Sequence, residues 1–259
     1  MEDLAGRVGV QLTARPDGPS SPARHHWFED VADHLGEAYL RYSFTKGTTQ
    51  EVAFLVSTLG LSPGSLVADV GCGPGRHTLG LAERGITTIG VDISERFVRL
   101  GASAAGPGAV FVRGDACRLP LRSAADAVIS VCQGGFGLLG LDGADGTALA
   151  EMTSALRPGG GLVCTAFSAY FQVRYLEESD TFDVDAGVNH ERTSVRSPHG
   201  VDMTADLWTT CFTPRELRLM AAAAGLEVDH IWGGTPGAYS PRAPTLDDPE
   251  LILVAHRPG

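Results

Sequence analysis

Short apolar runs alternate with amphipathic stretches along most of this chain, a pattern typical of an α/β fold. The run at 66–70 is apolar and β-branched, and the amphipathic stretch at 76–84 ends before Gly85. Further strands are predicted at 86–91, 109–113, 125–131 and 162–167. Strands that are buried on both faces show no polar alternation, so the pattern predicts a mostly parallel sheet with helices on both faces.

The segments on either side of this core have different patterns. Residues 1–24 show little periodicity and are expected to form a mobile tail. The stretch 25–47 carries an apolar stripe at helical spacing, which predicts a cap helix that packs on the sheet. The stripe consists of Trp27, Phe28, Val31, Leu35, Ala38, Tyr39 and Tyr42. The core is then expected at 48–167, an insertion at 168–211, and the closing elements at 212–259.

The insertion and the C-terminal segment contain turn and cap signals. Two stretches with strand character, 188–195 and 201–212, are separated by the turn sequence Ser-Pro-His-Gly and predict a β-hairpin. A capping box at Thr213 and Glu216 predicts the start of a helix. Two antiparallel closing strands are predicted at 226–232 and 250–256.

The turn after the first strand is rich in glycine, and an acid ends the second strand. Gly71, Gly73 and Gly75 let the backbone bend sharply and allow a ligand to approach it. Asp92 follows about 20 residues later, where a βαβ unit binds a ribose. A dinucleotide-binding turn has the spacing Gly-x-Gly-x-x-Gly, but Arg76 occupies its third glycine position here.

The actual spacing, Gly-x-Gly-x-Gly two residues after Asp69, resembles motif I of the class I S-adenosylmethionine-dependent methyltransferases. The resemblance covers residues 48–167 and 212–257, because later motifs follow in the same order. They include Gly114-Asp115-Ala116 after the third strand and the turn Leu156-Arg-Pro-Gly-Gly160 before the fifth. The resemblance implies a Rossmann-like sheet of seven strands, the last antiparallel, and S-adenosylmethionine as the cofactor.

The same resemblance assigns roles to residues of the cofactor site. The backbone of Gly71, Gly73 and Gly75 is expected to face the methionine end of the cofactor, with Asp69 ordering the turn. Asp92 is expected to accept hydrogen bonds from both ribose hydroxyls. The alternative for each acid is an ordinary solvated loop carboxylate.

Further roles concern the adenine and the methyl group. Ile93 is expected to pack on the adenine, Asp115 to accept from its amino group, and the Ala116 backbone to donate to its ring. Gln133, just beyond the fourth strand, is expected near the transferable methyl group. A loop amide that simply faces water is the alternative for Gln133.

Two tyrosines near the end of the predicted cap helix are candidates for a contact with the positively charged sulfur of S-adenosylmethionine. An aromatic face attracts a cation by roughly 0.5–2 kcal/mol, and the related enzymes often place an aromatic residue there. We expect one of Tyr39 and Tyr42 near the site, with plain core packing as the alternative. Four residues of the insertion are candidates for covering the substrate: Tyr170, Tyr175, His190 and Trp208. The alternative is that they only pack the insertion against the α/β core.

Composition and charge narrow the choice of substrate. The chain has 259 residues and a formal net charge of −11, and its arginines are scattered. Binding to nucleic acid requires a basic face. The Asn/Asp-Pro-Pro-aromatic signature of enzymes that methylate planar amino groups is also absent, with Val131 to Phe136 in its place. The expected substrate is therefore a small molecule or a short peptide, and not a nucleic acid.

The number and spacing of the cysteines and the hydropathy of the chain predict the cellular compartment. Five widely spaced cysteines without a Cys-x-x-Cys pair predict a reducing compartment, no disulfide framework and no metal site. No stretch approaches the roughly 18 apolar residues of a membrane span, and the N-terminus does not resemble a signal peptide. We therefore expect a cytoplasmic protein without a membrane partner. Lys46 is the only lysine beside many arginines, which suggests a GC-rich bacterial genome.

The sequence constrains the mechanism without fixing it. Methyl transfer is an in-line displacement, so alignment supplies much of the acceleration, whereas a hydroxyl or carbon nucleophile also needs a base. His190 and Gln133 are the predicted catalytic residues, with His77 as a second candidate base. The nucleophile (O, N or C) and the oligomeric state stay open. The alternatives are a nicotinamide-dependent oxidoreductase, which Arg76 disfavours, and a non-methylating protein that binds the same cofactor.

Overall fold

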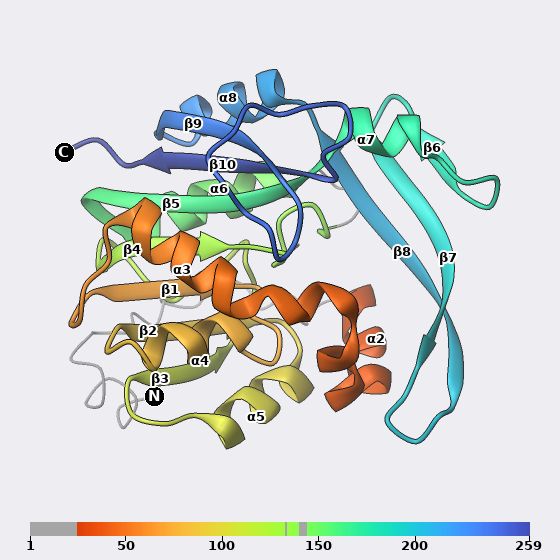
Figure 1. The fold of residues 1–259 in the computed structure, drawn as a ribbon, viewed down its shortest axis with the longest axis horizontal. Coiled ribbons are helices and arrows are strands. Elements are labelled where there is room, and N and C mark those ends of the chain that lie inside the picture. Colours follow the sequence, from red (N-terminus) through yellow and green to blue (C-terminus); the bar gives the residue numbers. More distant parts are fainter. Residues whose placement is uncertain (1–24, 133, 140–143) are drawn as a thin grey trace, which may run out of the picture.

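The computed structural model of this protein describes residues 25–132, 134–139 and 144–259, so the predicted tail and Gln133 lie outside it. At its centre, strands lie in the order β3–β2–β1–β4–β5–β10–β9 (Figure 1). These strands are β1 (Leu66–Val70), β2 (Thr87–Asp92), β3 (Ala109–Arg113), β4 (Ala125–Ser130), β5 (Leu156–Ser168), β9 (Glu227–Gly234) and β10 (Glu250–His256). The first five are parallel, and β10 runs antiparallel to both neighbours. The predicted Rossmann-like sheet is confirmed.

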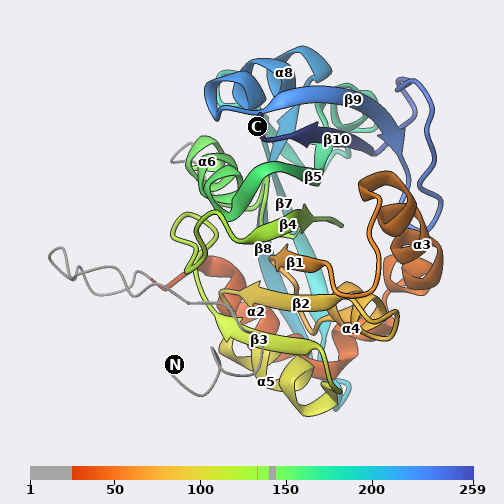
Figure 2. The same ribbon diagram turned by 90° about the vertical axis from the view of Figure 1, so that its left-hand side faces the viewer.

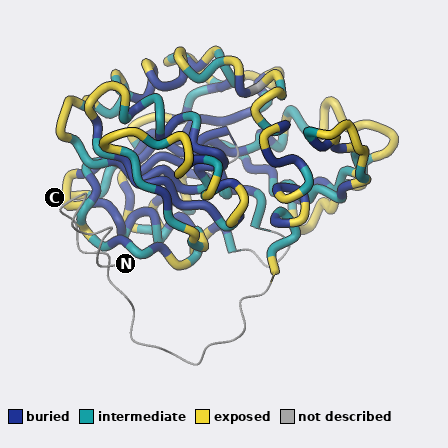
Figure 3. Tube along the Cα trace, turned by 90° about the horizontal axis from the view of Figure 1, so that it is seen from below, coloured by how far each residue is buried: buried dark blue, intermediate teal, exposed yellow. Residues whose placement is uncertain are grey.

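Helices cover both faces of this sheet (Figure 2). Each face has its own hydrophobic core. α3 (Thr48–Leu59) and α4 (Arg76–Ala82) pack on one face, and α6 (Asp145–Ala155) and α8 (Pro214–Ala223) pack on the other. α5 (Glu95–Ala104) lies beside β3. Buried residues concentrate in the central strands (Figure 3). None of the helices in the described part of the chain has the length and apolar character needed to cross a bilayer.

Glycines make room for one aromatic ring between the sheet and these helices. Phe111 of β3 is 8% exposed, and its ring lies against Gly75, Gly90 and Gly101. A Cβ at Gly75 or Gly101 would overlap the ring. The last glycine of the loop after β1 therefore serves the packing of α4 and β3.

The N-terminal cap is shorter as an α-helix than its apolar stripe predicts. α2 (Trp27–Leu35) ends at Gly36, whose φ of +44° breaks the helical path. Two 3-10 turns follow, η1 (Gly36–Arg41) and η2 (Ser43–Gly47). Tyr39 lies within the first turn and Tyr42 just after it, so the prediction of one continuous helix through both residues is wrong.

The insertion forms an antiparallel arm (Figure 1). It consists of β6 (Thr181–Asp183), β7 (Val188–Arg196) and β8 (Asp202–Phe212), and the predicted hairpin is present as β7 and β8. The last residues of β8 pair with the end of β5, which joins the arm to the main sheet. β6 and the short helix α7 (Ala169–Arg174) are missed by the sequence pattern, because such short elements leave no readable periodicity.

The arm packs against α2 through a small apolar contact that we call the α2–arm seam. It consists of Val31 and Leu35 from α2 and Val195 and Ala205 from the arm, each at most 6% exposed. Nearby, the Nε2 atom of His34 lies 2.9 Å from the carbonyl oxygen of Val201 at the tip of the arm.

Two local predictions have different outcomes. The capping box is present: the side chain of Thr213 accepts from the backbone N–H of Glu216, and Glu216 reaches back to the N–H of Thr213. The turn expected at 156–160, before the fifth strand, instead lies within β5 as a bulge, because the pairing with β4 jumps from Ala125–Leu156 to Ala127–Gly161.

Candidate functional site

A cavity of about 940 Å³ opens at the carboxyl ends of the parallel strands. The strand order reverses at β1, since β2 lies on one side of it and β4 on the other. Ligands of open α/β sheets bind at such a switch point. The walls come from the glycine loop, the ends of β2 and β3, the loop after β4, the N-terminal cap and the arm.

The glycine loop forms the floor of this cavity. Gly71 and Gly73 have φ values of +69° and +56°, which favour glycine. The N–H groups of Gly71 and Cys72 both donate to the carbonyl oxygen of Val91, at 2.7 and 3.1 Å. A Cβ at Gly71 would overlap the carbonyl of Gly134, so the loops after β1 and β4 touch where Gly71 has no side chain.

Asp92 holds the glycine loop from the end of β2. One carboxylate oxygen accepts from the N–H of Gly73 at 2.7 Å, and the other accepts from the N–H of Ser94 at 2.8 Å. The side chain is 5% exposed, and burial raises its pKa to about 6. A carboxylate offers about four acceptor positions, so Asp92 keeps capacity to accept hydrogen bonds from a ligand in the cavity that it lines.

Asp69 lies below the loop and not in the cavity wall. It is 2% exposed, and it accepts a hydrogen bond from the hydroxyl of Thr78 at 2.7 Å. Burial raises the pKa of Asp69. The contact ties the end of β1 to α4, which agrees with a role in ordering the turn.

The other end of the cavity contains the three residues expected around an adenine. Ile93, Asp115 and Ala116 all belong to the lining. Asp115 is exposed, and one of its oxygens accepts from the N–H of Cys117 at 2.8 Å. The geometry thus brings these three residues together with Gly71, Gly73 and Asp92.

The N-terminal cap contributes one tyrosine to the cavity. Tyr39 lines it, with its ring centroid 4.9 Å from that of Phe97 and its Cε1 atom 3.7 Å from where a Cβ of Gly73 would lie. The ring of Tyr42 is 6.4 Å from that of Tyr39 and does not belong to the lining. The structure therefore distinguishes between two tyrosines that the sequence could not separate.

Several lining residues were missed by the sequence reasoning as parts of a site. They are His25, His26, Trp27, Phe28, Phe97, Arg113 and Leu138. Arg113 donates to a carboxylate oxygen of Glu29 at 2.6 Å and so joins the end of β3 to α2. Only an apolar stripe marked Trp27 and Phe28, and such a stripe does not distinguish a cavity wall from a core.

Besides Asp69 and Tyr42, two further predicted residues are not brought to the cavity. Gly75 is covered by Phe111. His190 lies outside the lining: its ring stacks on Trp208 at 4.9 Å, and its Nε2 atom is 2.8 Å from a carboxylate oxygen of Asp206. We therefore assign His190 no contact with a reacting atom. Gln133 lies outside the described residues.

A buried polar network lies next to the glycine loop. Glu51 is fully buried, and one of its oxygens accepts from Arg76 and lies 2.8 Å from Nε2 of His77. Its other oxygen accepts from the N–H of Gly237 at 2.7 Å. Burial acts to raise the pKa of Glu51, but His77 and the Arg76 guanidinium outweigh it and hold this pKa at about 2.

The same network contains one possible set of metal ligands. Atoms of Glu51, His77 and Cys132 lie within 4.8 Å of one another, a proximity that their separation in sequence concealed. The guanidinium of Arg76 already binds the carboxylate, and Cys132 Sγ lies 3.1 Å from the Tyr239 hydroxyl. The Glu51 carboxylate is thus already paired with a cation, so we propose no metal there.

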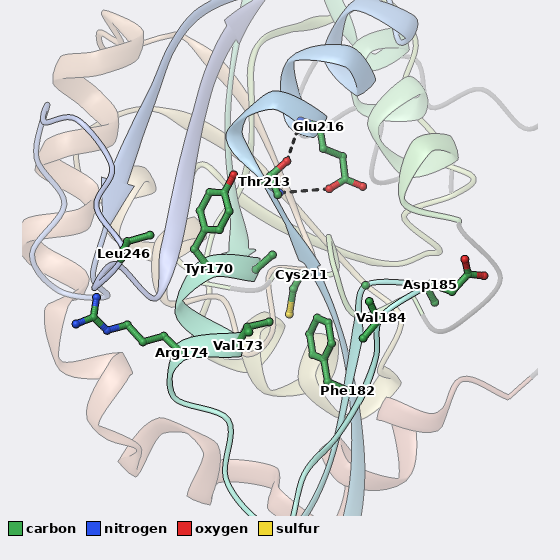
Figure 4. Close-up of a pocket in the computed structure, with 13 residues that line it drawn as sticks. Tyr170, Val173, Arg174, Phe182, Val184, Asp185, Cys211, Thr213, Glu216 and Leu246 are labelled. Atoms are coloured by element: carbon green, nitrogen blue, oxygen red, sulfur yellow. Dashed lines mark hydrogen bonds between the residues drawn. The ribbon is translucent and has the colours of Figure 1, made fainter.

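A second cavity, of about 720 Å³, lies at the base of the arm (Figure 4). Val173 of α7 lies beside Phe182 in this cavity, while Tyr170 points toward Thr213 and Arg174 extends away toward Leu246. The second cavity shares no lining residue with the first cavity. Tyr170, a candidate to cover the substrate, lines this second cavity, whereas Trp208 lines the first.

Comparisons with known proteins agree with this geometry. The family model described as a methyltransferase domain matches residues 67–160. The chain is 34% identical over 113 residues to a demethylmenaquinone methyltransferase of Beutenbergia cavernae, a match that covers 44% of this chain and 45% of that protein. A protein of the same description from Renibacterium salmoninarum is 32% identical over 114 residues and covers 44% and 46%. The chain thus spans less than half the length of these curated relatives.

Solved structures extend the likeness of the fold over nearly the whole chain. The CcbJ methyltransferase of Streptomyces caelestis superposes with a TM-score of 0.69 at 22% identity, covering 90% of this chain and 96% of that one. The amino pentose methyltransferase CalS10 of Micromonospora echinaspora, solved with S-adenosylmethionine bound, has a TM-score of 0.61 at 23% identity and covers 85% and 95%.

Proposed function

We propose that this chain, whose core is a class I S-adenosylmethionine-dependent methyltransferase domain, transfers a methyl group from S-adenosylmethionine to a small molecule. The observation that carries the proposal is the bond from the N–H of Gly73 to the buried carboxylate of Asp92 at the floor of the 940 Å³ cavity. This hydrogen bond joins the glycine turn to a carboxylate that can still accept hydrogen bonds from the hydroxyls of a ribose. The family match and the fold support the same conclusion.

The lining residues fit this cofactor in order along the cavity. Gly71 and Gly73 present backbone to the methionine end, and Asp92 accepts from the two ribose hydroxyls. Ile93 packs on the adenine, and Asp115 accepts from its amino group, next to the Ala116 backbone. These assignments use only residues that the structure brings into one wall.

When bound, the cofactor supplies an electrophilic methyl group, which a nucleophile takes by in-line displacement while the sulfur keeps the electron pair of the broken bond. The protein's part is to align the two reactants and to exclude water, which accounts for much of the acceleration in such reactions. Tyr39 and Phe97 form an apolar wall beside Gly73 for this purpose. Gln133 stays a proposed neighbour of the methyl group.

No general base is assigned to this reaction. His77 is 4% exposed and engaged with Glu51, and His190 lies outside the cavity lining. An amine nucleophile needs only to be neutral when it attacks, whereas an oxygen or carbon nucleophile needs a base. The choice among O, N and C therefore stays open. The net charge of −11 supports a small molecule rather than a nucleic acid.

Thermal melting with three nucleotides tests the cofactor. S-adenosylhomocysteine at 100 times its dissociation constant should add about 2.7 kcal/mol, which raises the midpoint of a chain of this size by about 5–10 °C. NAD and NADP should produce no shift, because Arg76 replaces the third glycine of a dinucleotide turn. A shift with a nicotinamide nucleotide alone would overturn the assignment. Turnover then separates an enzyme from a protein that only binds the cofactor.

The affinity for S-adenosylhomocysteine should decrease as the pH falls through about 6. Burial raises the pKa of Asp92 to about 6, and the carboxylate is the form that accepts from both ribose hydroxyls. Affinity is then complete above this pKa and lost below it, about tenfold weaker at pH 5 than at pH 7. Calorimetric titration between pH 5 and 8 measures this slope. Asp92→Asn should abolish it, and a slope that persists in this variant would assign the titration to another group.

Tyr39→Leu should weaken binding of S-adenosylmethionine more than binding of S-adenosylhomocysteine. The first ligand carries a sulfonium cation and the second a neutral thioether, and a cation over an aromatic face gains roughly 0.5–2 kcal/mol. We expect the ratio of the two affinities to change by about 3- to 10-fold. Tyr39→Phe keeps the ring and should keep the ratio. Equal losses for both ligands in Tyr39→Leu would leave the residue a packing role only.

A further inference from the structure

Five aromatic side chains from three separate segments line the cofactor cavity. Tyr39, Phe28 and Trp27 come from the N-terminal cap, Phe97 from α5 and Trp208 from the arm. Each ring contacts the next: the centroids are 4.9 Å apart for Tyr39 and Phe97, 6.0 Å for Phe97 and Phe28, 5.6 Å for Phe28 and Trp27, and 5.7 Å for Trp27 and Trp208. We call this row of rings the aromatic wall, and it leads from the glycine loop to the arm.

The part of the aromatic wall nearest the arm has no role toward the proposed cofactor. Trp27, Phe28 and Trp208 follow Tyr39 along the row, away from the place expected for the sulfur. Leu138, from the loop after β4, adds an apolar side chain to the same cavity. Ligand pockets are mostly lined by aromatic and apolar side chains, with a few polar groups that fix the orientation of the ligand. This part of the cavity therefore suits the aromatic ring of a second ligand.

The charges around the cavity are paired or already assigned. The charged residues and histidines of the lining are His25, His26, Glu29, Asp92, Arg113 and Asp115. Glu29 accepts from Arg113 at 2.6 Å, and the Nε2 atom of His25 lies 2.8 Å from a carboxylate oxygen of Asp30. Burial lowers the pKa of His26, so its ring is neutral at pH 7. The two aspartates are assigned to the cofactor, so the described lining keeps no charged side chain for a charged substrate.

A buried donor within the aromatic wall has no partner. The indole nitrogen Nε1 of Trp27 is buried, and no group of the described residues forms a hydrogen bond with it. An indole N–H can only donate, and a buried donor without an acceptor destabilises the structure. A ligand that brings an acceptor to Trp27 would remove that cost. An ammonium group fits less well, because it has three donors and no acceptor.

We propose that the methyl acceptor is a neutral aromatic molecule whose ring packs on the aromatic wall and whose oxygen accepts a hydrogen bond from the indole N–H of Trp27. The oxygen belongs to a carbonyl, an ether or a hydroxyl group, each of which offers lone pairs to a donor. Trp27 binds the substrate and takes no part in moving the methyl group. This inference rests on the proposed function, because it identifies the molecule held beside that cofactor.

Three matched probes test the inference on protein saturated with S-adenosylhomocysteine. Acetophenone has both the ring and the acceptor, cyclohexyl methyl ketone has the acceptor on a saturated ring, and 1-phenylethylamine has the ring with an ammonium group in place of the carbonyl. Saturation-transfer NMR titrations should show acetophenone binding about 3- to 10-fold more tightly than the saturated ketone. It should bind about 10-fold more tightly than the amine.

The three tryptophans of the chain provide the variants and their control. Trp27→Phe keeps a ring and removes the N–H, so it should remove the preference for acetophenone over the amine. Trp208→Leu removes a ring and should reduce the preference for acetophenone over the saturated ketone. Trp232→Phe is the control, because Trp232 of β9 packs on Phe54, at 5.8 Å between ring centroids, and lies outside this cavity. It should change neither preference.

The outcomes separate this inference from the proposed function. Equal binding of the two ketones, binding of the amine as tight as that of acetophenone, or no binding of any probe would each overturn the inference. A preference over the amine that survives Trp27→Phe would overturn it as well. Failure of S-adenosylhomocysteine itself to bind would instead overturn the proposed function. Calorimetric titration of each variant with S-adenosylhomocysteine controls for folding.

Discussion

Asp92→Ala should weaken the binding of S-adenosylhomocysteine by about 100-fold or more. The carboxylate is expected to accept two charge-assisted hydrogen bonds from the ribose, and each is worth roughly 1.5–3 kcal/mol. The substitution also removes the acceptor for the N–H of Gly73 and thereby loosens the loop that we propose faces the methionine end. Isothermal calorimetry at pH 7.5 measures the loss.

The fold should survive this substitution. A buried carboxylate with a raised pKa destabilises the folded state when ionised, so its removal offsets part of the cost of leaving two N–H groups without an acceptor. Asp115→Asn is the matched control at the exposed end of the cavity, and its effect should be smaller. Wild-type affinity in Asp92→Ala would refute the ribose assignment.

Gly71→Ala should destabilise the protein by more than about 4 kcal/mol or prevent folding. Two effects add at this position. A φ of +69° costs an alanine roughly 1–2 kcal/mol, and the new Cβ would overlap the backbone carbonyl of Gly134, which cannot rotate away as a side chain can.

Gly60→Ala separates the two effects. Gly60 has a similar φ of +60°, and a Cβ there meets nothing within 4 Å. It should therefore cost only the roughly 1–2 kcal/mol of the backbone conformation. Urea unfolding of both variants gives the difference. If the two substitutions cost the same, the contact between the loops after β1 and β4 is not the reason for a glycine at position 71.

The sequence predicts well what is local in the chain. The strand Ala109–Arg113 and the strand Glu250–His256 are found at the predicted bounds, because continuous apolar runs between turn residues are readable one segment at a time. The capping box at Thr213 is equally local, since both of its hydrogen bonds join residues three apart. The glycine loop and Asp92 belong to the same βαβ unit, which explains why both could be assigned to one site from the sequence; the direct bond between Gly73 and Asp92 was not predicted.

What the sequence could not provide depends on contacts between distant segments. Glu51 accepts from Arg76 and from the N–H of Gly237, which come from different parts of the chain. Trp208 reaches the cavity only because the arm folds back on α2. The choice of Tyr39 over Tyr42 depends on Gly36, whose positive φ ends α2 and changes the direction of the chain. The spacing of apolar residues along the sequence carries no information about such contacts between distant segments.

The α2–arm seam also has a kinetic consequence. The seam joins α2 to the arm, and both of these elements contribute to the cavity wall, α2 through Trp27 and Phe28 and the arm through Trp208. Its four buried side chains contrast with the large cores on the two faces of the sheet. Segments held by few buried apolar contacts open at the lowest free energy. We therefore expect separation of this seam to open the cavity, and in the proposed reaction its rate would set an upper limit on turnover.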